Sequence, residues 1–96
     1  ITFSFNWTCE AEVGYDYFTV HNMTTDITPV ANSELSNDNK IGLAEYNNQS
    51  IKASEEIIIP IDQANTTRRI CFSWRNDTSV ENNPPAILDN IKILYK

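Results

Sequence analysis

Glycine is scarce in this chain, which has 2 glycines, Gly14 and Gly42, among 96 residues. A β-rich protein needs turn residues that tolerate positive φ angles, and asparagine is the next choice after glycine. The sequence holds 12 asparagines, spread along its whole length. We therefore predict that asparagine forms many of the turns for which other proteins use glycine.

Basic residues and long apolar runs are also few. Seven Lys and Arg residues stand against 13 Asp and Glu, which gives a net charge of −6 and an isoelectric point near 4.5. Such a surface repels phosphate backbones and anionic lipids, so we expect no nucleic-acid partner. The longest aliphatic run, residues 57–61, contains Pro60 and falls far short of the roughly 20 residues of a membrane-spanning helix. We expect no membrane span.

Histidine and cysteine, which serve as bases and nucleophiles in many catalytic sites, are few. The chain has one histidine, His21, two cysteines, Cys9 and Cys71, and no Cys-x-x-Cys spacing. A thiol–imidazole pair is one interpretation, but no local motif supports it, and cysteine in a strand usually packs or forms a disulfide. No glycine-rich phosphate loop and no Gly-x-Ser-x-Gly motif occurs. We therefore predict that the protein is not an enzyme and holds no cofactor.

Alternation of apolar and polar residues dominates what is present. Residues 1–8 read Ile-Thr-Phe-Ser-Phe-Asn-Trp-Thr, which sends every second, apolar side chain to one face of a strand. Segments rich in β-branched and aromatic residues, bounded by turn residues, predict further strands. These segments are residues 15–21, 40–46, 55–61, 68–74 and 86–95. Residues 24–39 are predicted to form a loop with a short strand around Ile27, and residues 47–50 a turn.

These strands, and the lack of an amphipathic helical period, predict an all-β fold. Short strands at regular spacing are typical of an antiparallel β-sandwich, and we expect the jelly-roll type. A chain of this length makes one domain, so we interpret residues 1–96 as a single β-sandwich module. The apolar parity of the strands predicts a shared, buried core. Its expected members are Phe5, Trp7, Phe72, Trp74 and Ile91.

The two cysteines differ in strand parity. Cys9 follows the apolar parity of its strand, whereas Cys71 has the polar parity of its own. Side chains on opposite faces do not meet the strict separation limits of a disulfide. We therefore predict that Cys9 and Cys71 are not bonded to each other.

Asp89 is the acidic residue with the most unusual position. It has the parity of Ile87, Ile91 and Ile93, so we expect it to point toward an apolar face. A buried carboxylate is costly unless it is paired or bound to a metal. A hydrogen-bonded turn or a salt bridge to an arginine is the favoured interpretation, because a calcium site needs several oxygen ligands and none cluster here in the sequence. A structural calcium ligand is the alternative.

Tyrosine and asparagine side chains offer further sites. Lectin-like modules stack sugars on exposed aromatic rings, and Tyr15, Tyr17 and Tyr46 are the rings least committed to the core. Five asparagines lie in Asn-x-Ser/Thr sequons, against about two expected by chance, and a secreted eukaryotic protein would carry glycans on them. The sequon asparagines are Asn6, Asn22, Asn48, Asn65 and Asn76.

Three segments near the two ends of the chain form a further pattern. They read Phe-Asn-Trp-Thr-Cys-Glu at 5–10, Tyr-Asp-Tyr-Phe-Thr-Val at 15–20, and Phe-Ser-Trp-Arg-Asn-Asp at 72–77 leading to Pro-Pro-Ala-Ile-Leu-Asp-Asn-Ile at 84–91. Together these segments resemble the choice-of-anchor J group of jelly-roll modules, found in surface and secreted proteins of gut and oral bacteria. That group is similar to MAM domains and to the cleaved adhesin domains of bacterial surface proteases. Residues 24–66 carry none of the resemblance.

The resemblance implies an extracellular or cell-surface β-sandwich used for adhesion, for carbohydrate binding or substrate attachment, or as a spacer beside catalytic domains. A surface glycan or protein is then the expected ligand, and a purely structural module without a ligand is the alternative. In related jelly rolls an acid on the final strand holds a structural calcium with an acid from the first strand. Asp89 matches the final-strand position, and Asn90 stands where relatives often carry a second acid.

The start of the chain departs from this group. Its members usually carry an aromatic-rich segment and a strand or two before the Phe-x-Trp strand, whereas the sequence begins at Ile1, within that strand. Jelly rolls pair their first and last strands, so an edge would be left exposed. We expect edge-to-edge self-association with another copy, or pairing with upstream strands of the same polypeptide.

Overall fold

The computed structural model describes residues 1–63, 65–76 and 85–94, and these residues form six strands. The strands are β1 (Thr2–Cys9), β2 (Tyr17–Thr24), β3 (Lys40–Tyr46), β4 (Gln49–Ile58), β5 (Arg68–Arg75) and β6 (Ile87–Leu94). The helical segments in this part of the chain are two 3-10 turns, η1 (Asn37–Asn39) and η2 (Ile61–Gln63), and neither is long enough to cross a membrane. The all-β prediction is confirmed.

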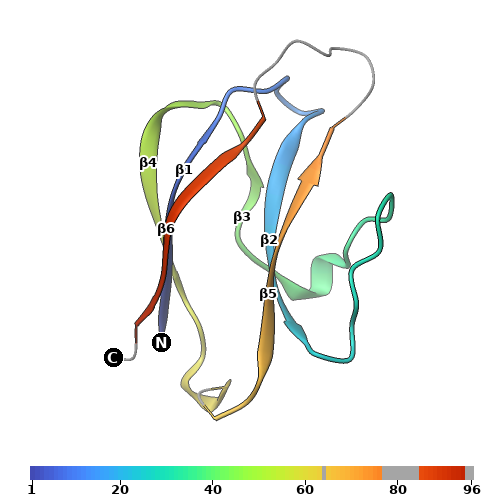
Figure 1. Ribbon diagram of the computed structural model, residues 1–96, viewed down its shortest axis with the longest axis vertical. Helices are drawn as coiled ribbons and strands as arrows, with labels where there is room; N and C mark the ends of the chain where they lie inside the picture. Colours follow the sequence, from blue (N-terminus) through green and yellow to red (C-terminus); the bar gives the residue numbers. More distant parts are fainter. Residues whose placement is uncertain (64, 77–84, 95–96) are drawn as a thin grey trace.

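The six strands form two antiparallel sheets that face each other (Figure 1). One sheet, here called the β1 sheet, has the order β4-β1-β6, and the other, the β2 sheet, has the order β3-β2-β5. β1 and β2 are therefore paired on both edges, while the other four strands are sheet edges. β3 and β4 are joined by Asn47 and Asn48 and border one side of the sandwich, the closed side. β5 and β6 border the other, the open side.

The strict alternation in β1 produces the centre of the core. Phe3, Phe5, Trp7 and Cys9 are buried, and the polar residues between them are half-buried on the outer face. Phe5 meets Phe18 of β2 edge-to-face, with ring centroids 6.3 Å apart, and this contact joins the two sheets. The predicted inward face of the first strand is confirmed.

Tyr46, at the end of β3, fills the closed side. Its ring stacks on Phe18 with centroids 4.7 Å apart, and it has no exposed surface. The phenol oxygen accepts a hydrogen bond from the Leu43 backbone N–H at 3.0 Å and donates one to Glu55 at 2.7 Å. Gly42 makes this possible, because its φ is 76° and a Cβ there would overlap the Tyr46 hydroxyl.

Asparagine takes the left-handed backbone positions, as predicted from the shortage of glycine. Asn32, Asn48 and Asn90 have φ angles of 63°, 57° and 56°, and they are the non-glycine residues with positive φ in the described ranges. Asn48 lies in the tight connection between β3 and β4. Asparagine tolerates this conformation because its short polar side chain can bond locally to the backbone.

Asn90 also overturns the predicted face of the last strand. β6 pairs with β1 as Phe3↔Ile93, but beyond a register shift near Asn90 it pairs as Asn6↔Asp89. The shift is a β-bulge, which adds one residue and reverses the alternation. Asp89 therefore lies with Asn6 on the outer face, away from the inward Ile93. The prediction that Asp89 points toward an apolar face is wrong.

Two of the five predicted core residues are not buried. Phe5 and Trp7 are buried, and Phe72 packs against them, with its ring centroid 5.3 Å from that of Phe5. Trp74 and Ile91 have the expected inward parity but remain 40% and 53% exposed. They lie on β5 and β6, where no described strand covers the gap between the sheets. The parity was predicted correctly, but the burial was not.

Most strand positions agree with the sequence, with two differences. β4 begins at Gln49, six residues before the predicted start, so the turn after β3 consists of Asn47 and Asn48. The segment around Ile27 is loop and not strand. Tyr95, at the end of the strand predicted over residues 86–95, lies outside the described residues.

Candidate functional site

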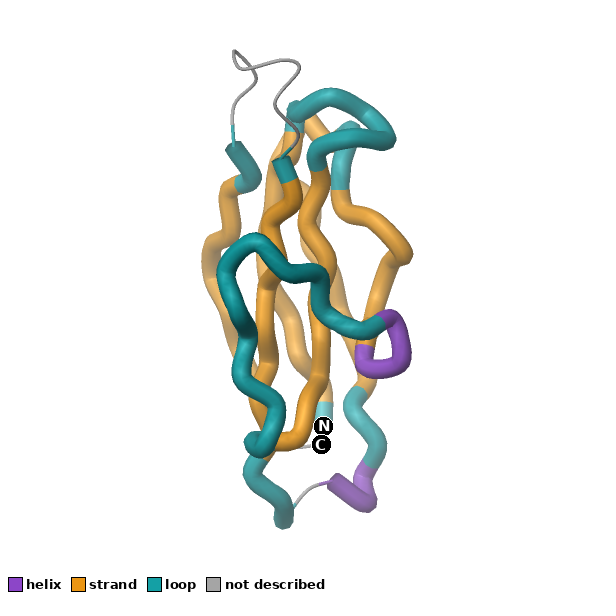
Figure 2. Tube along the Cα trace, turned by 90° about the vertical axis from the view of Figure 1, so that its right-hand side faces the viewer, coloured by secondary structure: helices purple, strands orange, loops and turns teal. Residues whose placement is uncertain are grey.

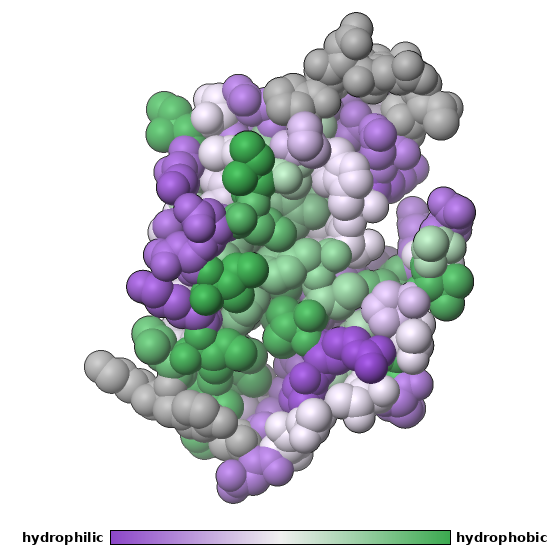
Figure 3. All heavy atoms as spheres, in the orientation of Figure 1, coloured by the Kyte–Doolittle hydropathy of each residue, from purple (hydrophilic) through white to green (hydrophobic). Residues whose placement is uncertain are grey.

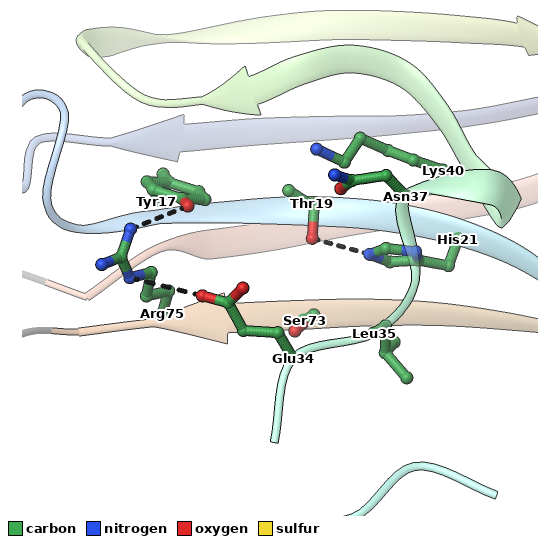
Figure 4. Close-up of a pocket in the computed structure, with 9 residues that line it drawn as sticks. All are labelled: Tyr17, Thr19, His21, Glu34, Leu35, Asn37, Lys40, Ser73 and Arg75. Carbon is green, nitrogen blue, oxygen red and sulfur yellow. Dashed lines mark hydrogen bonds and ion pairs between the residues drawn. The ribbon is translucent and has the colours of Figure 1, made fainter. Parts of the chain in front are cut away.

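A polar pocket lies on the outer face of the β2 sheet, beneath the loop of residues 25–36. That loop runs across the outside of the sheet before it reaches η1 and β3 (Figure 2). The pocket has a floor on β2 and β5 and a wall from the loop, as Figure 4 shows. The lining residues are Tyr17, Thr19, His21, Glu34, Leu35, Asn37, Lys40, Ser73 and Arg75.

The floor of the pocket follows directly from strand pairing. Tyr17 pairs with Arg75, and Thr19 pairs with Ser73, in an unbroken antiparallel register. Alternate residues of a strand share a face, so these four side chains form two adjacent rows on the outer surface. The row on β2 continues to His21, which is 2% exposed. A short ladder of hydroxyl, phenol and guanidinium groups results.

The wall of the pocket is held by a small cap at η1. The Ser36 hydroxyl accepts a hydrogen bond from the Asp38 backbone N–H at 3.2 Å, which fixes the start of the 3-10 turn. This places Asn37 over the sheet, and it brings Glu34 and Leu35 along the rim (Figure 4). The loop therefore contributes an acid, an amide and one apolar side chain.

Tyr17, Arg75 and Glu34 form a connected group at one end of the pocket. The Arg75 guanidinium donates to the Tyr17 phenol oxygen at 3.0 Å and lies 5.4 Å from the centroid of its ring. The Arg75 Nε is 3.8 Å from a Glu34 carboxylate oxygen, and the Arg75 side chain is 48% exposed while that of Glu34 is 82% exposed. Exposed ion pairs of this kind add little stability. The group instead brings a guanidinium, a carboxylate and a phenol ring together at the pocket.

His21 is held at the other end of the pocket by two side chains. Its Nδ1 lies 2.8 Å from the Asn39 side-chain oxygen, and its Nε2 lies 2.8 Å from the Thr19 hydroxyl. Because an amide oxygen only accepts, Nδ1 carries the proton in this arrangement. In the neutral ring Nε2 then accepts from Thr19. His21 thus orients the Thr19 hydroxyl within the pocket.

The thiols do not complete a nucleophilic pair with this histidine. Cys71 is the cross-strand partner of His21 on β5, but both ring nitrogens of His21 are already bonded to other side chains. Cys9 is buried on the other sheet, and burial raises the pKa of its thiol, with the nearby Asp16 carboxylate adding to the shift. Both cysteines are free, as the parity predicted.

The pocket is shallow and small. It encloses about 40 Å³, which is room for a water molecule or a single hydroxyl-bearing group but not for a whole sugar ring. A ligand would therefore lie across the rim and insert one substituent between the loop and the sheet. Donors and acceptors from β2, from β5, from the loop with η1 and from the start of β3 converge on that space.

The three tyrosines expected to bind sugars are placed very differently. Tyr17 lines the pocket. Tyr15 is 55% exposed, in the link before β2, and it does not line the pocket. Tyr46 is fully buried in the core, so the prediction that it presents a ring to a surface ligand is wrong. β3 shifts its register against β2 between Ile41 and Tyr46, and Tyr46 pairs with the buried Phe18.

The surroundings of Asp89 do not fit a calcium ion. Its carboxylate lies 3.3 Å from the Lys52 ammonium group, and both side chains are about 60% exposed. No group of three or more His, Cys, Asp or Glu residues gathers anywhere in the described ranges. A calcium site needs several oxygen ligands, and a lysine amine is a competing cation. The favoured interpretation was a hydrogen-bonded turn or a salt bridge to an arginine. Asp89 accepts a hydrogen bond from the Asn90 backbone N–H at 2.7 Å, and its ionic partner is a lysine.

The sequon asparagines also differ in accessibility. Asn48, Asn65 and Asn76 are exposed, whereas Asn6 is half-buried on β1. Asn22 is buried, with its amide nitrogen donating to Gln63 at 2.8 Å and its oxygen accepting from Arg68 at 3.0 Å. A glycan on Asn22 would break this arrangement, so the structure contradicts that site as an acceptor.

Strand parity was the signal that could have revealed the pocket floor. Tyr17, Thr19 and His21 alternate on one predicted strand. Ser73 and Arg75 alternate in and just beyond another, but the sequence does not show that these two strands pair.

Comparisons of the chain with protein-family models, with curated proteins and with solved structures found no match.

Proposed function

We propose that this protein is a non-catalytic, extracellular binding module that recognises a polyhydroxylated ligand, such as a surface glycan, at the pocket of the β2 sheet. The observation that carries the proposal is the convergence of hydroxyl, phenol, amide, carboxylate and guanidinium groups in one small space. Sugar hydroxyls both donate and accept hydrogen bonds, so mixed donors and acceptors beside an aromatic ring suit them. The jelly-roll type of sandwich and the choice-of-anchor J resemblance belong to the same proposal.

Tyr17 and Arg75 are the anchoring residues in this proposal. Tyr17 offers an aromatic ring and a phenol group, and Arg75 adds planar donors beside it. Glu34 faces them from the loop and supplies an acceptor for sugar hydroxyls. Thr19, oriented by His21, bonds the inserted substituent. Only noncovalent contacts are assigned to these groups.

The proposal is tested by glycan binding with two tyrosine variants. The purified chain is screened on an array of bacterial, plant and host glycans, and hits are titrated by calorimetry. Tyr17→Ala should weaken binding about tenfold or more, because a stacked or hydrogen-bonded aromatic anchor is lost. Tyr15→Ala is the matched control and should leave affinity unchanged, since that exposed ring lies outside the pocket.

Two outcomes would contradict the proposal. Equal losses in the Tyr15 and Tyr17 variants would place the contact elsewhere on the surface. Absence of glycan binding by the unmodified, folded chain would favour the alternative of a purely structural spacer. The small enclosed volume of about 40 Å³ is the observation that favours that alternative.

A further inference from the structure

β5 presents an unpaired backbone edge on the open side of the sandwich. The strand pairs with β2 over its whole length without a register shift, and no second described strand pairs with it. A regular free edge is a template for the addition of another strand. β6, the other edge strand of this side, is less suitable because the bulge at Asn90 interrupts it.

A hollow of about 250 Å³ lies beside this edge. One wall is residues 71–74 of β5, and the other is residues 29–33 with Leu35 from the loop. Apolar side chains on both walls face solvent, since Val30 is 67% exposed and Trp74 is 40% exposed. The hollow therefore has room and apolar surface for side chains of an extended segment that lies along β5.

The gap between the sheets is apolar on the same side. Phe72 and Trp74 point into it from β5, and Ile91 and Ile93 point into it from β6. Ile93 is 56% exposed although its cross-strand partner in β1 is buried. Figure 3 shows apolar surface along the face of the molecule seen in the orientation of Figure 1. A segment with apolar residues at every second position would cover this surface.

Charge distinguishes between the segments that could pair here. β5 carries Arg68, Arg69 and Arg75 and no acidic residue, within a chain of net charge −6. Antiparallel pairing with a second copy of β5 would bring Arg75 of each copy toward Arg68 and Arg69 of the other, and like charges across strands repel. Acidic residues near both ends of an incoming strand would instead form favourable pairs.

We infer that the free edge of β5 is a docking site for an extended segment of another polypeptide, apolar at alternate positions and acidic at both ends. The segment joins the β2 sheet as an antiparallel strand, and its backbone N–H and C=O groups pair with those of β5. Its apolar side chains cover Phe72 and Trp74, and its acids lie beside Arg69 and Arg75. Arg75 also lines the outer-face pocket, where its Nε lies 3.8 Å from Glu34, so the acid at that end shares the guanidinium with Glu34.

The fluorescence of Trp74 gives a direct test, because the other tryptophan, Trp7, is buried. The probe is a capped seven-residue peptide that alternates valine and threonine and has a glutamate at each end. Saturable binding should shift the tryptophan emission to shorter wavelength as Trp74 loses solvent. The shift should disappear in Trp74→Phe. The same peptide with lysine at both ends should bind about tenfold more weakly.

Two further variants separate strand addition from nonspecific adsorption. Arg69→Glu, checked for its fold by circular dichroism, should weaken binding of the glutamate peptide and strengthen binding of the lysine peptide. A glutamate peptide with N-methyl groups on alternate backbone nitrogens should not bind, because it cannot donate to the edge. Equal binding of all three peptides, or no binding at all, would overturn the inference. A concentration-dependent dimer that the peptide does not dissociate would assign the edge to a second copy instead.

Discussion

The two sides of the sandwich use similar residues with opposite results. On the closed side, Tyr46 stacks on the core and is completely buried, and Ile57 of β4 is 8% exposed. On the open side, Trp74 and Ile93 also point between the sheets but remain 40% and 56% exposed. Inward direction is set by strand parity, whereas burial requires a neighbour that covers the side chain. On the open side the side chains point inward, but no described strand covers them.

This difference predicts where the protein's stability is concentrated. Residues packed near the closed side should contribute most of the free energy of unfolding that single substitutions can remove. Residues of the open side should contribute less, and they remain available for contact with other molecules. Substitutions on the two sides should therefore differ in their effect on the free energy of unfolding.

The two tryptophans give the largest contrast. Trp7 is 6% exposed and meets Tyr46 edge-to-face with centroids 5.1 Å apart. Trp7→Ala should lower the free energy of unfolding by about 3–5 kcal/mol, because it leaves a large cavity. Trp74→Ala should cost about 1–2 kcal/mol, since much of its ring is already in water. Urea unfolding followed by circular dichroism measures both, and equal losses would refute the comparison.

The two glycines give the next contrast. Gly42→Ala places a Cβ against the Tyr46 hydroxyl at a φ of 76°, and we expect a loss of about 2–4 kcal/mol. Gly14→Ala is the matched control, with a φ of 84° and no atom within 4 Å of the new Cβ. It should cost only the backbone strain, about 1–2 kcal/mol. A Gly42 variant as stable as the Gly14 variant would show that Tyr46 does not occupy the closed side.

Tyr46→Phe tests the hydrogen bonds of the same site and its pH dependence. The variant loses the bonds to Leu43 and Glu55, which should cost about 1–2 kcal/mol near neutral pH. Burial raises the pKa of the Tyr46 phenol far above its usual value of 10.0, and Glu55 adds to the shift.

The raised pKa fixes the direction of the alkaline effect. The folded state keeps the Tyr46 proton at a pH where the unfolded chain has released it. Stability is therefore complete below pH 10 and falls as the pH rises above it, by at most about 1.4 kcal/mol per pH unit from this residue. Tyr46→Phe should lack that contribution. Parallel alkaline slopes in the two proteins would contradict the buried position.

Asp89→Asn should have the smallest effect. The pair with Lys52 is exposed, so its loss should change stability by less than about 1 kcal/mol. Millimolar calcium should raise the melting temperature of neither the parent chain nor the variant. A calcium-dependent rise in the parent alone would restore Asp89 as a metal ligand and show that Lys52 moves away.

The sequence predicted local features well. Strict alternation identified β1, and β-branched and aromatic runs located β2, β3 and β5 within a few residues. These features depend only on neighbours in the chain, because side-chain direction has a period of two residues. The preference of asparagine for left-handed positions was predictable for the same reason.

Features that depend on several strands were not predictable. The bulge at Asn90 places the side chains of Asp89 and Ile87 on the opposite face of the sheet from the predicted one. No residue pattern predicted the bulge. The burial of Tyr46 depends on Gly42 and Glu55, which approach it only after β3 bends and β4 folds beside it. The pocket likewise depends on the pairing of β2 with β5 and on the path of the 25–36 loop.

Quenching of tryptophan fluorescence by acrylamide tests the open side most directly. Trp7→Phe leaves Trp74 as the single emitter, and Trp74→Phe leaves Trp7. If β5 and β6 border an uncovered gap, acrylamide should quench Trp74 efficiently and Trp7 only weakly, with emission of Trp74 at longer wavelength. Equal, weak quenching of both residues in the isolated, monomeric chain would mean that Trp74 is covered and that the open side does not exist.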